Sequence, residues 1–68
     1  MRIKIDGRRL RQIREYRRLS QEELARLAGC GVAAVGRIER GESGGAGLRR
    51  DLAAALGVEP ETISLEAP

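Results

Sequence analysis

The sequence predicts an all-α fold, a compact bundle of five short helices in a single domain that spans residues 1–68. Two observations carry this prediction. Apolar residues recur at helical spacing between glycines, and Ser20 followed by Glu23 has the spacing of a capping box that starts a helix at Gln21. In addition, 41% of the chain is hydrophobic and Tyr16 is its only aromatic residue, which suits a small bundle of aliphatic side chains.

The first helix is predicted to begin after Asp6, a suitable N-cap residue, and to run to about Arg18. Before it, residues 2–5 alternate polar and apolar side chains, and residues 62–65 near the other end do the same. These strand-like segments are candidates to pair with each other, within one chain or across a dimer.

Residues 19–41 are the segment around which the chain is organised. The second helix is predicted to bury an apolar stripe made of Leu24, Leu27 and Ala28. Gly29 and Gly31 then end the helix and permit a tight turn, because glycine adopts backbone conformations that other residues avoid.

A third helix is expected over residues 32–40, with Val35 and Ile38 facing inward and Gly41 at its end. Two short helices around a glycine-bearing turn form a helix-turn-helix, and the second helix of such a motif fits a DNA major groove. The sequence therefore predicts a surface for DNA on this third helix.

The remaining chain is expected to add a flexible, glycine-rich connection over residues 42–47 and a fourth helix. The apolar stripe of this helix comprises Leu48, Leu52, Ala55 and Leu56. Gly57 is predicted to end the helix, and Pro60 is predicted to open a last turn that holds Ile63.

Two charges of opposite sign lie on stripes that are otherwise apolar. Arg14 follows Leu10 by four residues, and Glu39 follows Val35 by four residues. Because a lone buried charge is costly, we predict an Arg14–Glu39 ion pair that ties the first helix to the third. The alternative is that both side chains extend to solvent.

The net charge is +3, and it is unevenly distributed. Residues 1–26 hold nine Lys or Arg against four acidic residues, whereas residues 27–68 hold four against six. A polyanionic partner suits this pattern, although an arginine-rich, merely solvated surface would look the same.

Several classes of function are disfavoured. The chain has one cysteine and no histidine, which argues against a disulfide framework, the usual zinc sites and most catalytic constellations. We therefore expect no enzyme, cofactor or small-molecule ligand. The absence of a long apolar run predicts no membrane contact and a cytoplasmic location. Cys30 is expected to be a buried, inert thiol, with an exposed redox sensor as the alternative.

Three segments, LRQIREYRRLSQEELARLAG, RIERGE and LAAALGV, give the chain a family resemblance. Over residues 8–58 it resembles the Cro and phage-repressor (lambda-repressor-like, XRE) family of helix-turn-helix proteins. The resemblance implies a compact five-helix fold, binding of double-stranded DNA through the third helix, a homodimer, and a role as a transcriptional regulator, with repression favoured over activation.

The resemblance also implies roles for individual residues. Gln21 matches a glutamine that contacts a DNA phosphate, and Arg14 and Glu39 match an internal ion pair. The positions that face bases or nearby phosphates are Val32, Ala33, Gly36 and Arg37. The positions where contacts to the DNA backbone continue are Arg40, the loop 42–47, Arg49 and Arg50.

The third helix departs from the family pattern because it opens with small apolar residues in place of hydrogen-bonding ones. Val32 and Ala33 offer only apolar contact to a thymine methyl group, which leaves Arg37 as the central side chain able to read guanine. No local reason for a glycine is evident at position 36 in the middle of this helix. Two alternatives would explain it: close approach to a phosphate or a partner, or evolutionary drift. Arg49 stands where an apolar residue is common.

These departures leave two further interpretations open beside a DNA-binding regulator. One is a protein-interaction or antitoxin-like regulatory module, in which the small face of residues 33–36 receives a partner helix. The other is weak nucleic-acid binding without sequence preference.

Overall fold

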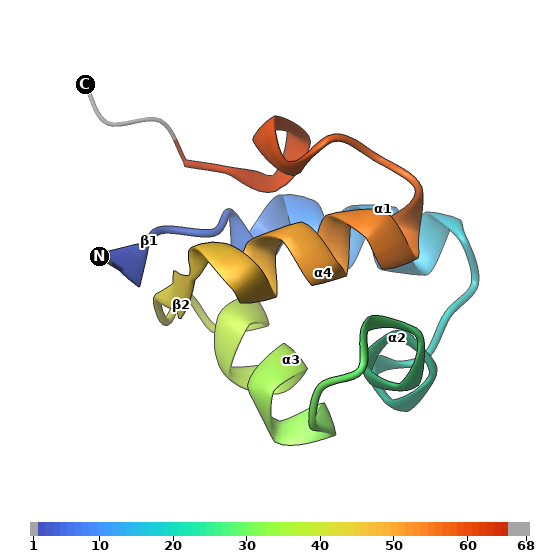
Figure 1. The fold of residues 1–68 in the computed structure, drawn as a ribbon. Coiled ribbons are helices and arrows are strands. Elements are labelled where there is room, and N and C mark those ends of the chain that lie inside the picture. The colour runs from blue at the N-terminus through green and yellow to red at the C-terminus, as the bar shows by residue number, and fades with distance from the viewer. Residues whose placement is uncertain (1, 66–68) are drawn as a thin grey trace.

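The computed structural model describes residues 2–65 and the side chains from Lys4 onward. Four α-helices, one 3-10 turn and two very short strands follow one another along the chain (Figure 1). In order they are β1 (Arg2–Ile3), α1 (Gly7–Tyr16), α2 (Gln21–Ala28), α3 (Val32–Glu39), β2 (Gly44–Gly45), α4 (Ala46–Leu56) and η1 (Pro60–Ile63).

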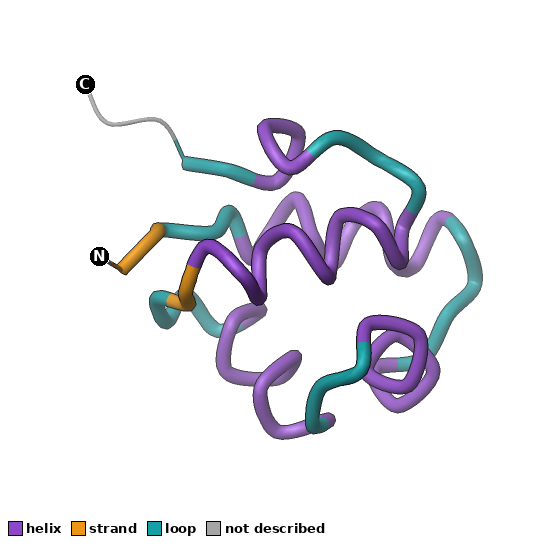
Figure 2. The backbone as a smooth tube through the Cα atoms, viewed as in Figure 1, coloured by secondary structure: helices purple, strands orange, loops and turns teal. Residues whose placement is uncertain are grey.

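The fold is mainly helical, as predicted, but it differs from five helices in two places. The last turn begins at Pro60 and holds the buried Ile63, as expected, yet it is a single 3-10 turn. The glycine-rich connection was expected over residues 42–47, but it is shorter, because Ala46 and Gly47 already belong to α4 and a strand forms at Gly44 and Gly45. These two residues form β2, and α4 begins directly afterwards (Figure 2).

The N-terminal strand pairs with β2 rather than with residues 62–65. β1 and β2 are antiparallel, with Arg2 opposite Gly45 and Ile3 opposite Gly44. The C-terminal segment pairs in part with the residues that follow β1, through a bridge between Ile5 and Ser64, a 3.2 Å bond from the Leu65 N–H to the Lys4 carbonyl and a 2.7 Å bond from the Asp6 N–H to the Ile63 carbonyl. The N-terminal segment thus lies between β2 and the C-terminal segment.

The core gathers apolar side chains from every helix. Its largest fully buried members are Ile5, Leu10, Leu24, Val35, Ile38, Leu52, Leu56 and Ile63. Leu27, expected to be buried, is 61% exposed. The buried face of α2 is centred between Leu24 and Ala25, which leaves Ala28 half-buried and turns Leu27 to solvent.

All four α-helices end in a Schellman motif. In this motif one residue after the helix adopts a left-handed conformation, and the N–H of the next residue bonds the carbonyl of the residue five positions before it. Gly29, Gly41 and Gly57 supply the left-handed residue after α2, α3 and α4. After α1 the residue is Arg18, with φ 59°, and the Leu19 N–H bonds the Arg14 carbonyl at 3.0 Å. The helix therefore ends before Arg18, two residues earlier than predicted.

Gly7 sets how closely α1 approaches α3. A Cβ atom at this buried position would collide with the carbonyl oxygen of Ile38 and would lie 3.0 Å from the Cα of Glu39. Both obstacles are backbone, so a side chain there would force the two helices apart. Gly7 thereby fixes one end of the α1–α3 contact.

We expect Gly7→Ala to lower the free energy of unfolding by about 1–3 kcal/mol or more, because overpacking displaces backbone. The matched control is Gly47→Ala in the first turn of α4, where a Cβ would meet no atom within 4 Å. That variant should gain about 0.4–1 kcal/mol by restricting the unfolded chain. Urea unfolding followed by circular dichroism measures both, and equal stability of the two variants would contradict this account.

Candidate nucleic-acid interface

One face of α3 is free of packing. Val32, Ala33 and Arg37 are exposed, Val32 to 44%, whereas Val35 and Ile38 on the opposite face are buried in the core. The outward orientation predicted for these three residues is confirmed. A helix supported from behind and open in front has the shape required to enter a major groove.

The predicted Arg14–Glu39 pair is present and supports α3 from behind. The Arg14 Nε donates to Glu39 Oε2 at 2.6 Å, and Nη2 donates to Oε1 at 3.0 Å. The two side chains are only 10% and 5% exposed. The remaining Arg14 nitrogen, Nη1, donates to the Leu19 carbonyl at 2.8 Å, so one guanidinium joins α1, the α1–α2 corner and α3.

The ion pair shifts the pKa values of both Arg14 and Glu39 toward their charged forms. Burial alone favours the neutral form of Glu39, but hydrogen bonds from Arg14 and Gln21 and the charge of Arg14 outweigh it, so the pKa of Glu39 lies below its ordinary value. The hydrogen bond to Glu39 raises the pKa of Arg14. Both groups are therefore charged throughout the physiological range.

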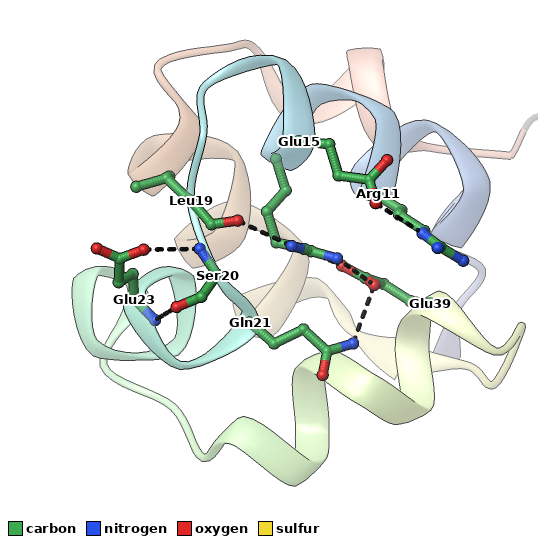
Figure 3. A network of polar contacts seen from close by, with 8 residues as sticks. Arg11, Glu15, Leu19, Ser20, Gln21, Glu23 and Glu39 are labelled. Atoms are coloured by element: carbon green, nitrogen blue, oxygen red, sulfur yellow. Dashed lines mark hydrogen bonds and ion pairs between the residues drawn. The ribbon is translucent and has the colours of Figure 1, made fainter.

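Gln21 is held by the same carboxylate. Its Nε2 donates to Glu39 Oε1 at 3.0 Å, and Figure 3 shows the amide reaching from the start of α2 to Glu39. An amide nitrogen carries two hydrogens, so one donor is left for another acceptor. Sequence reasoning placed Gln21 near DNA but missed this contact, because only the folded chain brings the two helices together.

Gly36 was expected at an exposed position, and this is wrong, because the residue is buried. A Cβ there would lie 3.2 Å from the Arg40 Nη1 and 4.0 Å from both polar atoms of the Gln21 amide. Arg40 thus folds back across α3 toward Gln21, and the missing side chain makes room for it. This packing supplies the local reason for a mid-helix glycine.

The N-terminus of α2 lies beside this cluster. Ser20 and Glu23 form the predicted capping box: the Ser20 Oγ accepts from the Glu23 N–H at 3.0 Å, and the Glu23 carboxylate accepts from the Ser20 N–H at 2.7 Å (Figure 3). The bond from the Ser20 backbone N–H, followed by that from its side chain, lowers the pKa of Glu23. The N–H groups of Gln21 and Glu22 precede the first helical bond and point outward.

The arginines expected to contact the DNA backbone differ in their exposure. Arg50 is exposed, but Arg49 is half-buried and donates to the Ser64 Oγ at 2.8 Å, while its buried Nε has no partner among the described residues. Arg49 therefore joins α4 to the segment after η1. Arg37 lies 3.9 Å from Glu42 in an exposed pair across the end of α3.

The rest of the chain offers little other chemistry. Cys30 is half-buried and unpaired, and burial, with a contribution from the charge of Asp51, raises the pKa of its thiol. A raised pKa lowers the fraction of the thiol that is ionised at neutral pH, and the thiolate is the reactive form. Over residues 2–65, no group of three or more metal-binding side chains occurs, and no helix is long and apolar enough to cross a bilayer.

Comparison with known proteins identifies several that resemble this chain in sequence and fold. A model of the helix-turn-helix domain family matches residues 7–65. The restriction-modification controller protein C.AhdI from Aeromonas hydrophila is 42% identical, with a TM-score of 0.80 over 82% of this chain and 86% of that one. No curated protein sequence matches the chain significantly.

Two larger proteins contain a similar domain. An HTH_3 family transcriptional regulator from Vibrio cholerae is 29% identical, with a TM-score of 0.79 over 84% of this chain and 33% of that one. A hydroxyethylphosphonate dioxygenase variant is 29% identical, with a TM-score of 0.81 over all of this chain and 14% of that one.

We expect Arg14→Ala or Glu39→Ala to lower the free energy of unfolding by about 3–5 kcal/mol, because each leaves a buried charge without its partner. The exposed Arg11–Glu15 pair, 64% and 55% exposed, is the matched control. Arg11→Ala should cost less than about 1 kcal/mol. Thermal or urea unfolding measures the differences, and an Arg14→Ala protein as stable as Arg11→Ala would exclude a stabilising pair.

The lowered pKa of Glu39 also gives the pair a defined acid dependence. The unfolded carboxyl titrates near about pH 4.3, so the stability gained from its ionised form is fully present above that pH. It is lost as the pH falls through the lower, folded pKa. We expect the stability difference between the parent and Glu39→Gln to be constant above about pH 5 and to shrink below pH 4. A difference that does not change on acidification would contradict this.

Proposed function

Because the chain belongs to the Cro/XRE type of helix-turn-helix family, we propose that it is a DNA-binding transcriptional regulator that inserts α3 into the major groove. We further propose that residues 1–68 act as one cytoplasmic, non-enzymatic domain without a cofactor. The similarity to a dioxygenase spans 14% of that chain and carries no inference of its chemistry.

The observation that carries the proposal is the outward face of α3, fixed from behind by a buried ion pair. Val32, Ala33 and Arg37 are exposed along this face, and Arg14 and Glu39 hold the helix in place. Because α3 is already held in its binding conformation in the free protein, it loses little further conformational entropy on binding DNA.

Contacts to phosphates position the domain in this proposal. The free N–H groups at the start of α2 lie at the positive end of its dipole, which favours an anion. Gln21 offers its second amide hydrogen there, and Arg40 lies next to it across Gly36. The exposed Arg50 would add a cation at α4, and Arg49, which donates to the Ser64 Oγ, would support that surface from α4.

Few side chains are available to read bases directly. Arg37 is the outward side chain that matches the two acceptors of guanine, and its exposed contact with Glu42 is loose at 3.9 Å. Val32 and Ala33 suit thymine methyl groups. The remaining preference for sequence would come from the shape and flexibility of the duplex.

We propose that the protein binds as a homodimer and acts mainly as a repressor. In this family architecture, two α3 helices read half-sites one helical turn, about 34 Å, apart. A pair of domains that fills two adjacent major-groove segments at a promoter would exclude other proteins from the same face of the duplex.

An antitoxin-like or other protein-interaction module is the second candidate. It is favoured by the small apolar surface of Val32 and Ala33, since a partner helix packs closely on such residues. Sequence-independent binding to nucleic acid is the third outcome. Selection of bound duplexes from a random pool separates the three: a regulator enriches one motif, a general binder enriches none, and a protein module retains no DNA.

We expect Arg37→Ala and Arg40→Ala to weaken DNA binding in different ways. Arg37→Ala should relax the preference at one base pair by about 1–3 kcal/mol, because a guanine contact is lost. Arg40→Ala should weaken all duplexes similarly and reduce the slope of log affinity against log salt by about 1. Fluorescence anisotropy with the selected duplex and single-base variants of it, at two salt concentrations, measures both effects.

Arg17→Ala is the matched control for charge. The Arg17 Nη2 lies 3.9 Å from the position of a Cβ on Gly57, which places the guanidinium at the end of α4. Its removal should leave DNA affinity unchanged within about twofold. Equal loss in the Arg17 and Arg37 variants would indicate general attraction to a cation-rich surface and would contradict a reading role for α3.

A further inference from the structure

We propose that a groove on α1 docks an acidic peptide segment of a protein partner that carries an aliphatic anchor residue. The groove has a volume of about 460 Å³. It is lined by Arg9, Gln12, Ile13, Tyr16, Arg17 and Val58. These residues come from one side of α1, from its C-cap residue Arg17 and from the turn between α4 and η1.

The floor of the groove is apolar, and part of its surface remains exposed. Ile13 and Val58 are half-buried and pack against the core from outside. Beside them Tyr16 is 87% exposed, although it is the only aromatic residue of the chain. Exposed tyrosines are enriched where proteins meet, because the ring buries apolar area and the hydroxyl remains able to hydrogen-bond. An aliphatic side chain laid between Ile13 and Tyr16 would cover this surface.

The rim of the groove determines the charge of the occupant. Arg9 and Arg17 stand on it, and no ion pair joins either guanidinium to a carboxylate within residues 4–65. Three arginines do form ion pairs among the described side chains: Arg11 with Glu15, Arg14 with Glu39 and Arg37 with Glu42. Two unmatched cations beside an apolar floor favour carboxylates flanking an apolar residue.

The groove lies on the side of α1 away from α3. Gly7 and Arg14 contact α3, and each is two positions from a groove residue, Arg9 and Tyr16 respectively. Two positions correspond to about 200° around a helix axis. A peptide in the groove and a duplex on α3 would therefore occupy opposite sides of α1 and bind without competing. The apolar floor, which a phosphate backbone would leave uncovered, favours an acidic peptide over nucleic acid as the occupant.

The test uses a synthetic acidic 12-residue peptide with leucines at its centre and no aromatic residue. Because Tyr16 is the only aromatic residue of the protein, its intrinsic fluorescence reports directly on the groove. We expect a saturable change in this fluorescence with the leucine peptide. A peptide of the same charge with serine in place of leucine should bind at least about tenfold more weakly, because the apolar anchor is missing.

The double variant Arg9→Glu with Arg17→Glu should reduce the affinity for the leucine peptide at least about tenfold. Arg8→Glu with Arg26→Glu makes the same change of charge at exposed positions outside the groove, and it should reduce the affinity less than about threefold. Equal loss in the two double variants, or no preference for leucine over serine, would overturn the proposal.

A final measurement keeps this inference separate from the proposed function. Saturating peptide should leave the affinity of the parent for its selected duplex unchanged, and the Arg9→Glu, Arg17→Glu variant should retain the parent's unfolding transition. Displacement of the peptide by a duplex would assign the groove to nucleic acid and would overturn the proposal. If no duplex binds at all, the proposed function fails while peptide binding still decides the groove.

Discussion

The Arg14–Glu39 ion pair holds three segments of the chain at once, and the form of the exposed α3 surface depends on it. Arg14 binds the Glu39 carboxylate through two nitrogens and the Leu19 carbonyl through the third. Glu39 in turn accepts from Gln21 at the start of α2. Charges buried this deeply are tolerated only with satisfied partners, and here almost every polar atom has one. The network therefore orients α2 and α3 together.

Two glycines complete this arrangement by removing side chains at the places where helices meet or cations fold back. Gly7 lets the backbone of α1 touch that of α3 near Ile38. Gly36 lets Arg40 lie across α3 toward Gln21. The first contact fixes the depth of α3 in the domain, and the second gathers polar groups at the edge of its exposed face. Mid-helix glycine disfavours helix formation, and in α3 that cost accompanies a specific packing arrangement.

Local signals explain which parts of the fold were predictable. Caps such as Asp6 and Ser20 and glycines at helix ends act within a few residues, so the sequence locates these boundaries. The ion pair was predictable because opposite charges stood on apolar stripes. The exposure of Leu27, the burial of Gly36 and the bond from Gln21 to Glu39 depend on where neighbouring helices lie. Residue spacing alone does not determine those positions. The α1 groove escaped prediction for the same reason, since Val58 joins it from a distant turn.

The corner between α1 and α2 shows what the network imposes on its surroundings. Arg18 adopts a left-handed conformation that costs an ordinary residue about 1–2 kcal/mol, where the other three helix ends use glycine. The next residue is the one whose carbonyl Arg14 binds. The corner is thus a locally frustrated segment, held by bonds between Arg14 and Leu19 and, through Arg14, by the distant residue Glu39. The shape of this corner therefore depends on α3 as well as on its own residues, because the same guanidinium that binds the Leu19 carbonyl is held by Glu39.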